Sequence, residues 1–190
     1  MNIGGLMNGR ILTERLLATT SLAALLLAAT GQQGAYAFHA CANTDPGGNP
    51  VNSGSIACIV VDNSGTTSLT NAASGVIGPP VGQSAISITG TGTLSGAIVN
   101  AGRIIGRSAS NAIGIGVDGL VQGGISNSGT ITINSSSAGN IEVYGIDVGY
   151  DLPSSVASFG GGISNGGTIS ITANVGSGQF YGIIESARTF

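Results

Sequence analysis

Apolar residues alternate with polar residues or glycine along most of the chain after Ala37. A period of two puts one face of a short strand inward, and β-branched residues between Gly, Asn and Ser turns favour strands. No stretch after Ala37 carries an apolar stripe with the helical period of about 3.6 residues. The pattern therefore predicts an all-β fold with short strands of about four to six residues.

An internal repeat is the strongest signal in this part of the chain. Residues 98–104, 125–131 and 163–169 align without gaps and read Ile-x-Asn-x-Gly-x-Ile. A looser upstream copy, residues 61–67, keeps Asn63 and Gly65 but ends in Thr67. A second shared element follows the three copies, at residues 112–117, 143–148 and 180–184. The repeat is therefore a unit of several strands, and because its spacing varies we expect the insertions to fall in loops.

Stacking of these copies would place like residues in columns. The isoleucine column is Ile98, Ile125 and Ile163, and the asparagine column is Asn100, Asn127 and Asn165. We expect the asparagine side chains to hydrogen-bond from one copy to the next, which makes a buried polar column tolerable. The glycines two residues later, Gly102, Gly129 and Gly167, predict a bend with positive φ. This stacking predicts a β-solenoid, most simply a right-handed parallel β-helix.

The first part of the chain has the pattern of an export signal. Arg10 and Arg15 precede an apolar run over residues 16–29, and Ala35 and Ala37 form an A-x-A cleavage signature. A transmembrane anchor is the alternative, but the run is shorter than the roughly 20 residues that span a bilayer. We therefore predict a helical signal peptide over residues 1–37, cleavage between Ala37 and Phe38, and export across the inner membrane.

Two cysteines follow the predicted cleavage site. An exported chain meets an oxidising compartment, so Cys41 and Cys58 are expected to form a disulfide. A loop of that length adds about 3 kcal/mol to stability in the chain-entropy account. Reactive thiols are the alternative, but no neighbouring cation would lower their pKa. The predicted domains are thus a signal peptide (1–37), a disulfide-clasped N-terminal cap (38–60) and β-helix repeats (61–190).

Composition then narrows the function classes. Only 7% of residues are charged and the five cations of the chain are all arginines, which excludes nucleic-acid binding through a neutralised phosphate backbone. The single histidine, His39, leaves little material for a histidine metal site or for histidine-based catalysis. We therefore predict no cofactor, no metal and no catalytic residues.

Two other sets of side chains remain as candidates. Asp147 and Asp151, in the longest insertion, are the carboxylates that a polysaccharide-degrading β-helical enzyme would use. Tyr144, Tyr150 and Tyr181 are candidates for an exposed binding face. Tyr144 and Tyr181 recur just before a glycine of the repeat, so packing between copies is an equal explanation for them.

The leader together with the repeat copies at residues 123–131 and 161–169 resembles the passenger domains of bacterial autotransporters. The resemblance covers residues 61–184 and implies a right-handed β-helix on the surface of a Gram-negative bacterium. Such passengers often serve adhesion, aggregation or biofilm formation, and some carry hydrolase domains. The resemblance therefore implies cell-surface or matrix ligands and the export machinery as partners. It also implies a C-terminal β-barrel translocator, for which this chain shows no run of alternating strands.

The last repeat unit stops after Ile184, before another Ile-x-Asn-x-Gly half. We therefore expect the N-terminal part of a passenger, at the outer membrane and cell surface if a full-length product exists and otherwise periplasmic or secreted. The leading functional hypothesis is a non-catalytic, adhesin-like structural or interaction protein. The alternatives are the β-helical polysaccharide-degrading enzyme and a truncated gene remnant without a function of its own.

Overall fold

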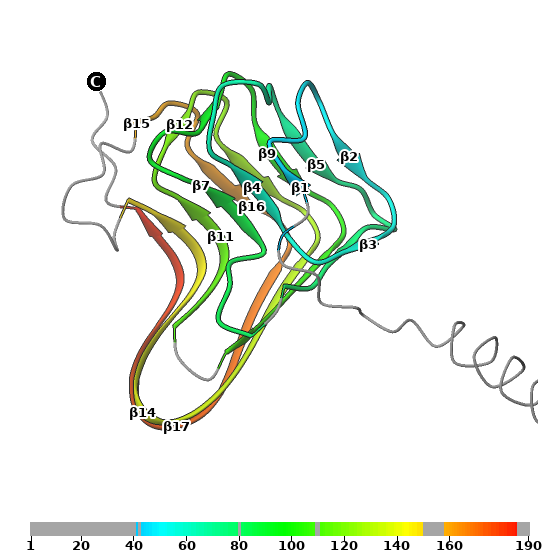
Figure 1. Ribbon diagram of the computed structural model, residues 1–190. Coiled ribbons are helices and arrows are strands. Elements are labelled where there is room, and N and C mark those ends of the chain that lie inside the picture. The colour runs from blue at the N-terminus through cyan, green and yellow to red at the C-terminus, as the bar shows by residue number, and fades with distance from the viewer. Residues whose placement is uncertain (1–40, 42, 80, 109–110, 150–157, 186–190) are drawn as a thin grey trace, which may run out of the picture. The chain divides into compact units, whose positions relative to one another are not determined.

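A computed structural model describes residues 41, 43–79, 81–108, 111–149 and 158–185 (Figure 1). The chain divides into two compact units, Met1–Ala37 and Phe38–Phe190. The predicted signal peptide and its cleavage site at Ala37 and Phe38 lie outside the described residues, as do Tyr150 and Asp151. All described residues belong to the second unit.

Every strand pair of the described residues is parallel, and the strands form three sheets. The largest sheet has nine strands. Its order is β1 (Asn43–Thr44), β4 (Ile59–Val61), β7 (Ile86–Ile88), β11 (Ala112–Val117), β14 (Thr130–Val148), β10 (Arg103–Ser108), β6 (Val76–Ile77) and β3 (Ser55–Ile56), with β17 (Thr168–Glu185) also paired to β14.

The other two sheets are smaller. One has three strands in the order β15 (Ser158–Phe159), β12 (Leu120–Val121) and β8 (Thr93–Leu94). The other has five strands in the order β16 (Ile163–Asn165), β13 (Ile125–Asn127), β9 (Ile98–Asn100), β5 (Leu69–Asn71) and β2 (Val51–Asn52).

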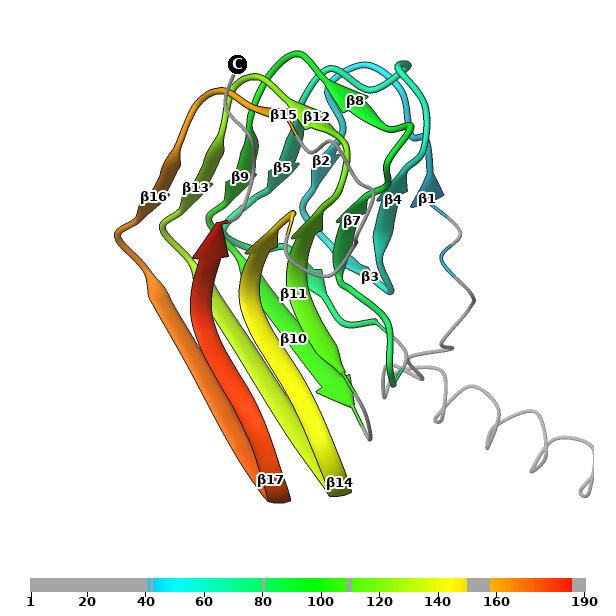
Figure 2. The same cartoon turned by 90° about the vertical axis from the view of Figure 1, so that its left-hand side faces the viewer.

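The chain passes through the sheets in the same order again and again, so that each passage forms a rung on the one before it (Figure 2). Strands β9 to β12, for example, form one rung, and β13 to β15 form the next. The described residues contain strands but no helix. The predicted all-β class is thus confirmed, and the parallel stacking is compatible with a β-solenoid.

The core lies between the sheets and consists of aliphatic columns. Ile125 pairs in register with Ile98 on one side and with Ile163 on the other, as the repeat predicts. Ile104 and Ile131 form a second column, and both are fully buried. Burial of such a side chain contributes about 1.5–3 kcal/mol, so the alternating isoleucines supply the main force that holds the rungs together.

Two strands are much longer than the sequence pattern predicts. Strand β14 has 19 residues and β17 has 18, and Figure 2 shows them as a long curved pair. The polar insertion expected to form a loop is part of this pair, because Ser136 and Ser137 of β14 pair with Asn174 and Val175 of β17. Two consecutive rungs carry matching insertions, so each satisfies the backbone hydrogen bonds of the other.

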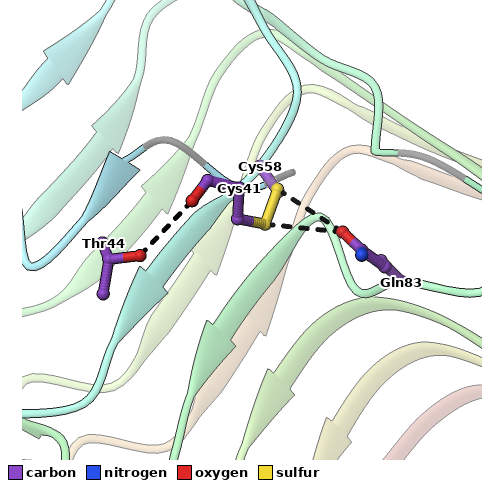
Figure 3. Close-up of a disulfide and its surroundings, with 4 residues drawn as sticks. All are labelled: Cys41, Thr44, Cys58 and Gln83. Carbon is purple, nitrogen blue, oxygen red and sulfur yellow. Dashed lines mark hydrogen bonds between the residues drawn. A yellow bond between two sulfur atoms is a disulfide. The ribbon is translucent and has the colours of Figure 1, made fainter. Parts of the chain in front are cut away.

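The disulfide lies near the start of the described residues. Cys41 and Cys58 are joined, with their Cα atoms 5.2 Å apart, and Cys58 is fully buried (Figure 3). The side-chain oxygen of Gln83 lies 3.7 and 3.9 Å from the two sulfur atoms. A disulfide has no proton to donate, so these are packing contacts in which the amide lies against the bond.

The region predicted as a separate cap takes part in the same sheets as the repeats. Strand β1 pairs with β4, β2 with β5, and β3 with β6, all parallel. The disulfide therefore fastens the start of the first rung.

Candidate functional site

A column of asparagine side chains crosses five rungs. Each side-chain Nδ2 donates to the Oδ1 of the next asparagine, at 2.8, 2.7, 2.6 and 2.7 Å in chain order. The members are Asn52, Asn71, Asn100, Asn127 and Asn165. The middle three are buried, with exposed fractions of 1% or less. The column satisfies its own polar atoms and so serves to hold the rungs in register.

The upstream repeat copy predicted at residues 61–67 is wrong. Asn63 lies in a turn and accepts a hydrogen bond from the N–H of Gly65, and Val61 pairs with Ile88. The residue in register with Asn100 is Asn71. A longer turn, closed by a bond from the N–H of Gly75 to the carbonyl of Ala72, separates Asn71 from its glycine, so gapless matching misses it.

The glycines of the repeat are needed for a different reason from the one predicted. Gly102, Gly129 and Gly167 are absent from the described glycines with positive φ. A Cβ on Gly167 would instead lie 2.8 Å from the carbonyl carbon of Ser128, and one on Gly129 would lie 2.6 Å from that of Ala101. Real Cβ atoms do not approach backbone this closely, so these glycines allow the turns of neighbouring rungs to touch.

The tyrosines lie in a column on β14 and β17. The rings of Tyr144 and Tyr181 stack with centroids 5.4 Å apart and planes inclined by 6°. Tyr144 is fully buried and Tyr181 is half-buried, which favours packing between copies over a fully exposed binding face. Tyr144 and Tyr181 therefore pack between rungs, and only the outer ring of the stack has access to solvent.

A hollow of about 460 Å³ lies beside this stack. Its lining residues are Asn111, Ile141, Glu142, Gly178 and Gln179. Two hydrogen bonds hold the lining in place. The N–H of Glu142 donates to the side-chain oxygen of Asn111 at 3.1 Å, and the hydroxyl of Tyr144 donates to the carboxylate of Glu142 at 2.9 Å. The hydroxyl of Tyr181 donates to Gln179 in the same way one rung later. The hollow is thus lined by amide, carboxylate and aliphatic groups, and the hydroxyl groups of the tyrosine column hold two of its lining side chains.

Asn111 and Gln179 are not recognised as candidate residues from the sequence, and Glu142 stands out only as one of several acids of the repeat, although a signal that groups the three exists. Each residue stands immediately before one copy of the second shared element, so the three share one repeat position. Glu142 and Gln179 are in register in the structure. Alignment of the repeat therefore predicts a polar column, which residue-by-residue inspection for catalytic types does not reveal.

The proposed carboxylate pair is not supported at Asp147. This residue lies within β14 and is 2% exposed, so it is not the loop carboxylate expected from the sequence. Asp151 lies outside the described residues. Within the described part of the chain, no group of three or more His, Cys, Asp and Glu side chains could hold a metal ion. No helix of the described residues is long and apolar enough to cross a membrane.

One pair of carboxyl groups interacts at the N-terminal side. Asp45, with a φ of 48°, accepts hydrogen bonds at Oδ1 from the N–H of Asp62 at 2.9 Å and of Asn63 at 3.1 Å. A side-chain hydrogen bond from Asp62 is the main cause that lowers the pKa of Asp45, and the same bond raises the pKa of Asp62. One proton is thus shared between the two groups.

Because of this pair, we expect the two aspartates to change folding stability in opposite directions on either side of their ordinary pKa of 3.8. Asp45 has a lowered pKa, so its contribution to the free energy of unfolding is lost as the pH falls below 3.8. Asp62 has a raised pKa, so its contribution is lost as the pH rises above 3.8. Asp62→Asn should therefore abolish the decline on the alkaline side, whereas a decline on the acid side persists because the backbone N–H groups of residues 62 and 63 still donate to Asp45. Urea midpoints measured from pH 3 to pH 7 provide the test, and an unchanged profile in Asp62→Asn would contradict it.

Comparison of the chain with protein-family models, with curated proteins and with solved structures found no match.

Proposed function

We propose that this chain is an exported, non-catalytic β-helical protein, similar to an autotransporter passenger, that binds neutral glycans of a cell surface or matrix. The observation that carries the proposal is the hollow beside the tyrosine column, with Asn111, Glu142 and Gln179 along its wall. Side-chain amides and a carboxylate form hydrogen bonds with sugar hydroxyls, and the aliphatic side chain of Ile141 provides an apolar contact for the sugar ring. The proposal includes a right-handed winding of the rungs.

Charge favours neutral over acidic glycans. Glu142 is the one ionisable residue among the five that line the hollow. An anionic sugar would face this carboxylate without a cation among the described lining residues, which is unfavourable in a partly enclosed site. Neutral sugars meet no such repulsion, because a carboxylate accepts hydrogen bonds from hydroxyl groups.

Export is supported by features at the start of the chain. The predicted cleavage signature ends at Ala37, after an apolar run that follows two arginines. The disulfide between Cys41 and Cys58 is of the kind that persists in an oxidising compartment. N-terminal sequencing of the protein recovered from the fractions of a Gram-negative cell tests the export proposal. A cytoplasmic product that still begins at Met1 would contradict it.

Binding is tested on an array of neutral and acidic glycans with the purified full-length product. Gln179→Ala should weaken binding of the neutral glycans about tenfold, since one good hydrogen bond is worth about 1 kcal/mol or somewhat more. Gln122→Ala is the matched control, because Gln122 is also exposed but lies in the turn after β12. Equal binding by Gln179→Ala and Gln122→Ala would refute the site.

The same samples distinguish binding from catalysis. Reducing ends released from the array glycans during incubation are measured alongside binding. A steady release that Gln179→Ala abolishes would replace the binding proposal by an enzymatic one. Retention of the glycans without release is the expected result.

A further inference from the structure

Each strand of the last described rung has a neighbour on one side only. This end rung consists of β15, β16 and β17, which pair with β12, β13 and β14. Figure 2 shows the orange and red strands β16 and β17 as the outermost layer. All three sheets of the described chain therefore end in open edges at the same level.

Along the open edge of β17, every second residue points its backbone N–H and C=O groups away from β14. The N–H of Thr168 donates to the carbonyl of Gly129 in the preceding rung at 2.9 Å. In a parallel strand the N–H and C=O of one residue point to one neighbour and those of the next residue to the other. The groups of Ile169 and Ile171 therefore point away from β14, toward the open side.

The apolar interior is also open at this end. Val143 and Ile146 of β14 are fully buried, whereas their partners in β17, Phe180 and Ile183, are 43% and 41% exposed. Ile169 is likewise only partly buried against the core. Large apolar side chains beside an unpaired strand edge form a surface that folded proteins normally cover.

The opposite end of the stack does not match this edge. Its outer strands β1, β2 and β3 have two residues each, against 18 in β17. Pro46 and Pro50 lie beside them and have no N–H to donate. A head-to-tail contact would therefore leave most of β17 unpaired, and the edge of equal length is another β17.

We propose that two copies of this chain associate tail to tail, with β17 of one copy paired antiparallel to β17 of the other. A two-fold axis makes such an interface self-complementary and closes it at a dimer. Pairing along almost the whole strand sets Glu185 opposite Ile169 of the second copy, and Glu185 is the one charged residue of β17, so no like charges meet across the edge. An edge of 18 residues is about 60 Å long and about 10 Å deep, which approaches the roughly 800 Å² per partner of a stable interface.

The proposal is tested by sedimentation equilibrium on the product of the full-length sequence, which is expressed with residues 1–37 included. The wild type should form a dimer in a concentration-dependent way. Ile183→Lys should raise the dimer dissociation constant at least tenfold: in the monomer the ammonium group reaches solvent at the open end, whereas in the dimer it is buried. Thr172→Lys is the matched control, because Thr172 is exposed on the outer side of the same strand and stays in solvent in the dimer.

Three outcomes would overturn the proposal: a wild type that stays monomeric, an open-ended series of oligomers, or equal weakening by Ile183→Lys and Thr172→Lys. Circular dichroism checks that Ile183→Lys is folded, and Phe180→Lys replaces it if it is not. Glycan binding measured on the same variants separates this proposal from the proposed function. Loss of the dimer with glycan binding intact supports the interface, and loss of binding in Gln179→Ala with the dimer intact tests the hollow.

Discussion

Gly129→Ala should destabilise the folded chain by about 3 kcal/mol or more. The added Cβ would lie 2.6 Å from the carbonyl carbon of Ala101 and nearer still to the carbonyl oxygen of Gly102. Both atoms belong to the backbone of the preceding turn, so no side chain can rotate away. Relief would require the rungs to separate, yet the N–H of Gly129 bonds to the carbonyl of Asn100 at 3.0 Å.

Gly166→Ala is the matched control for this prediction. A Cβ at Gly166 would meet nothing within 4 Å, and its φ is not among the positive values. The position in register one rung earlier is Ser128, which shows that a side chain is accommodated there. Gly166→Ala should therefore change stability by less than about 1 kcal/mol, and a gain is expected because alanine restricts the unfolded chain. Urea unfolding followed by circular dichroism measures both variants, and equal losses would contradict the close-approach explanation.

The register of the rungs is the feature that the sequence predicts best. The repeat has fixed offsets between Ile, Asn and Gly, and a shift by one residue would turn every isoleucine outward. Only one alignment of Ile98, Ile125 and Ile163 keeps all of them inside, and the structure has that alignment. Strong periodicity without gaps therefore determines both the strand type and the neighbours.

The predictions that the structure contradicts all concern contacts between rungs. The polar insertion of β14 reads as a loop by itself and becomes a strand because β17 carries a matching one. The sequence predicts a bend with positive φ at Gly129, whereas glycine is required there because the turn of the preceding rung occupies the space of a Cβ. Asn71 escapes notice because its turn is longer, although its side chain occupies the same column as Asn100. Each error comes from treating one copy of the repeat in isolation.

The candidate site was predictable only in part. Tyr144 and Tyr181 stand out as aromatic residues at one repeat position, but their burial depends on stacking, which brings the two rings together. Asn111 and Gln179 lie far from each other in sequence and have no catalytic character of their own. The hollow exists because parallel rungs place the same repeat position side by side three times. A search for catalytic residue types therefore passes over it.

Asn127→Ala should destabilise the chain by about 2–3 kcal/mol. The Nδ2 of Asn100 donates to Asn127 at 2.6 Å, and Asn100 is fully buried. Removal of the acceptor leaves this donor without a partner where water has no access, and a buried unsatisfied group costs about 1–3 kcal/mol. The loss of the packed amide adds to this penalty.

The same substitution at the end of the column should have a small effect. Asn165 is exposed, so in Asn165→Ala water takes its place and accepts the bond from Asn127. We expect a loss below about 1 kcal/mol. If hydrogen bonding along the column is what matters, Asn100→Ala and Asn127→Ala should also be strongly non-additive, because the first change already breaks the bond that the second removes. Additive losses in the double variant, or equal losses at Asn127 and Asn165, would show that the amides act as independent packing groups.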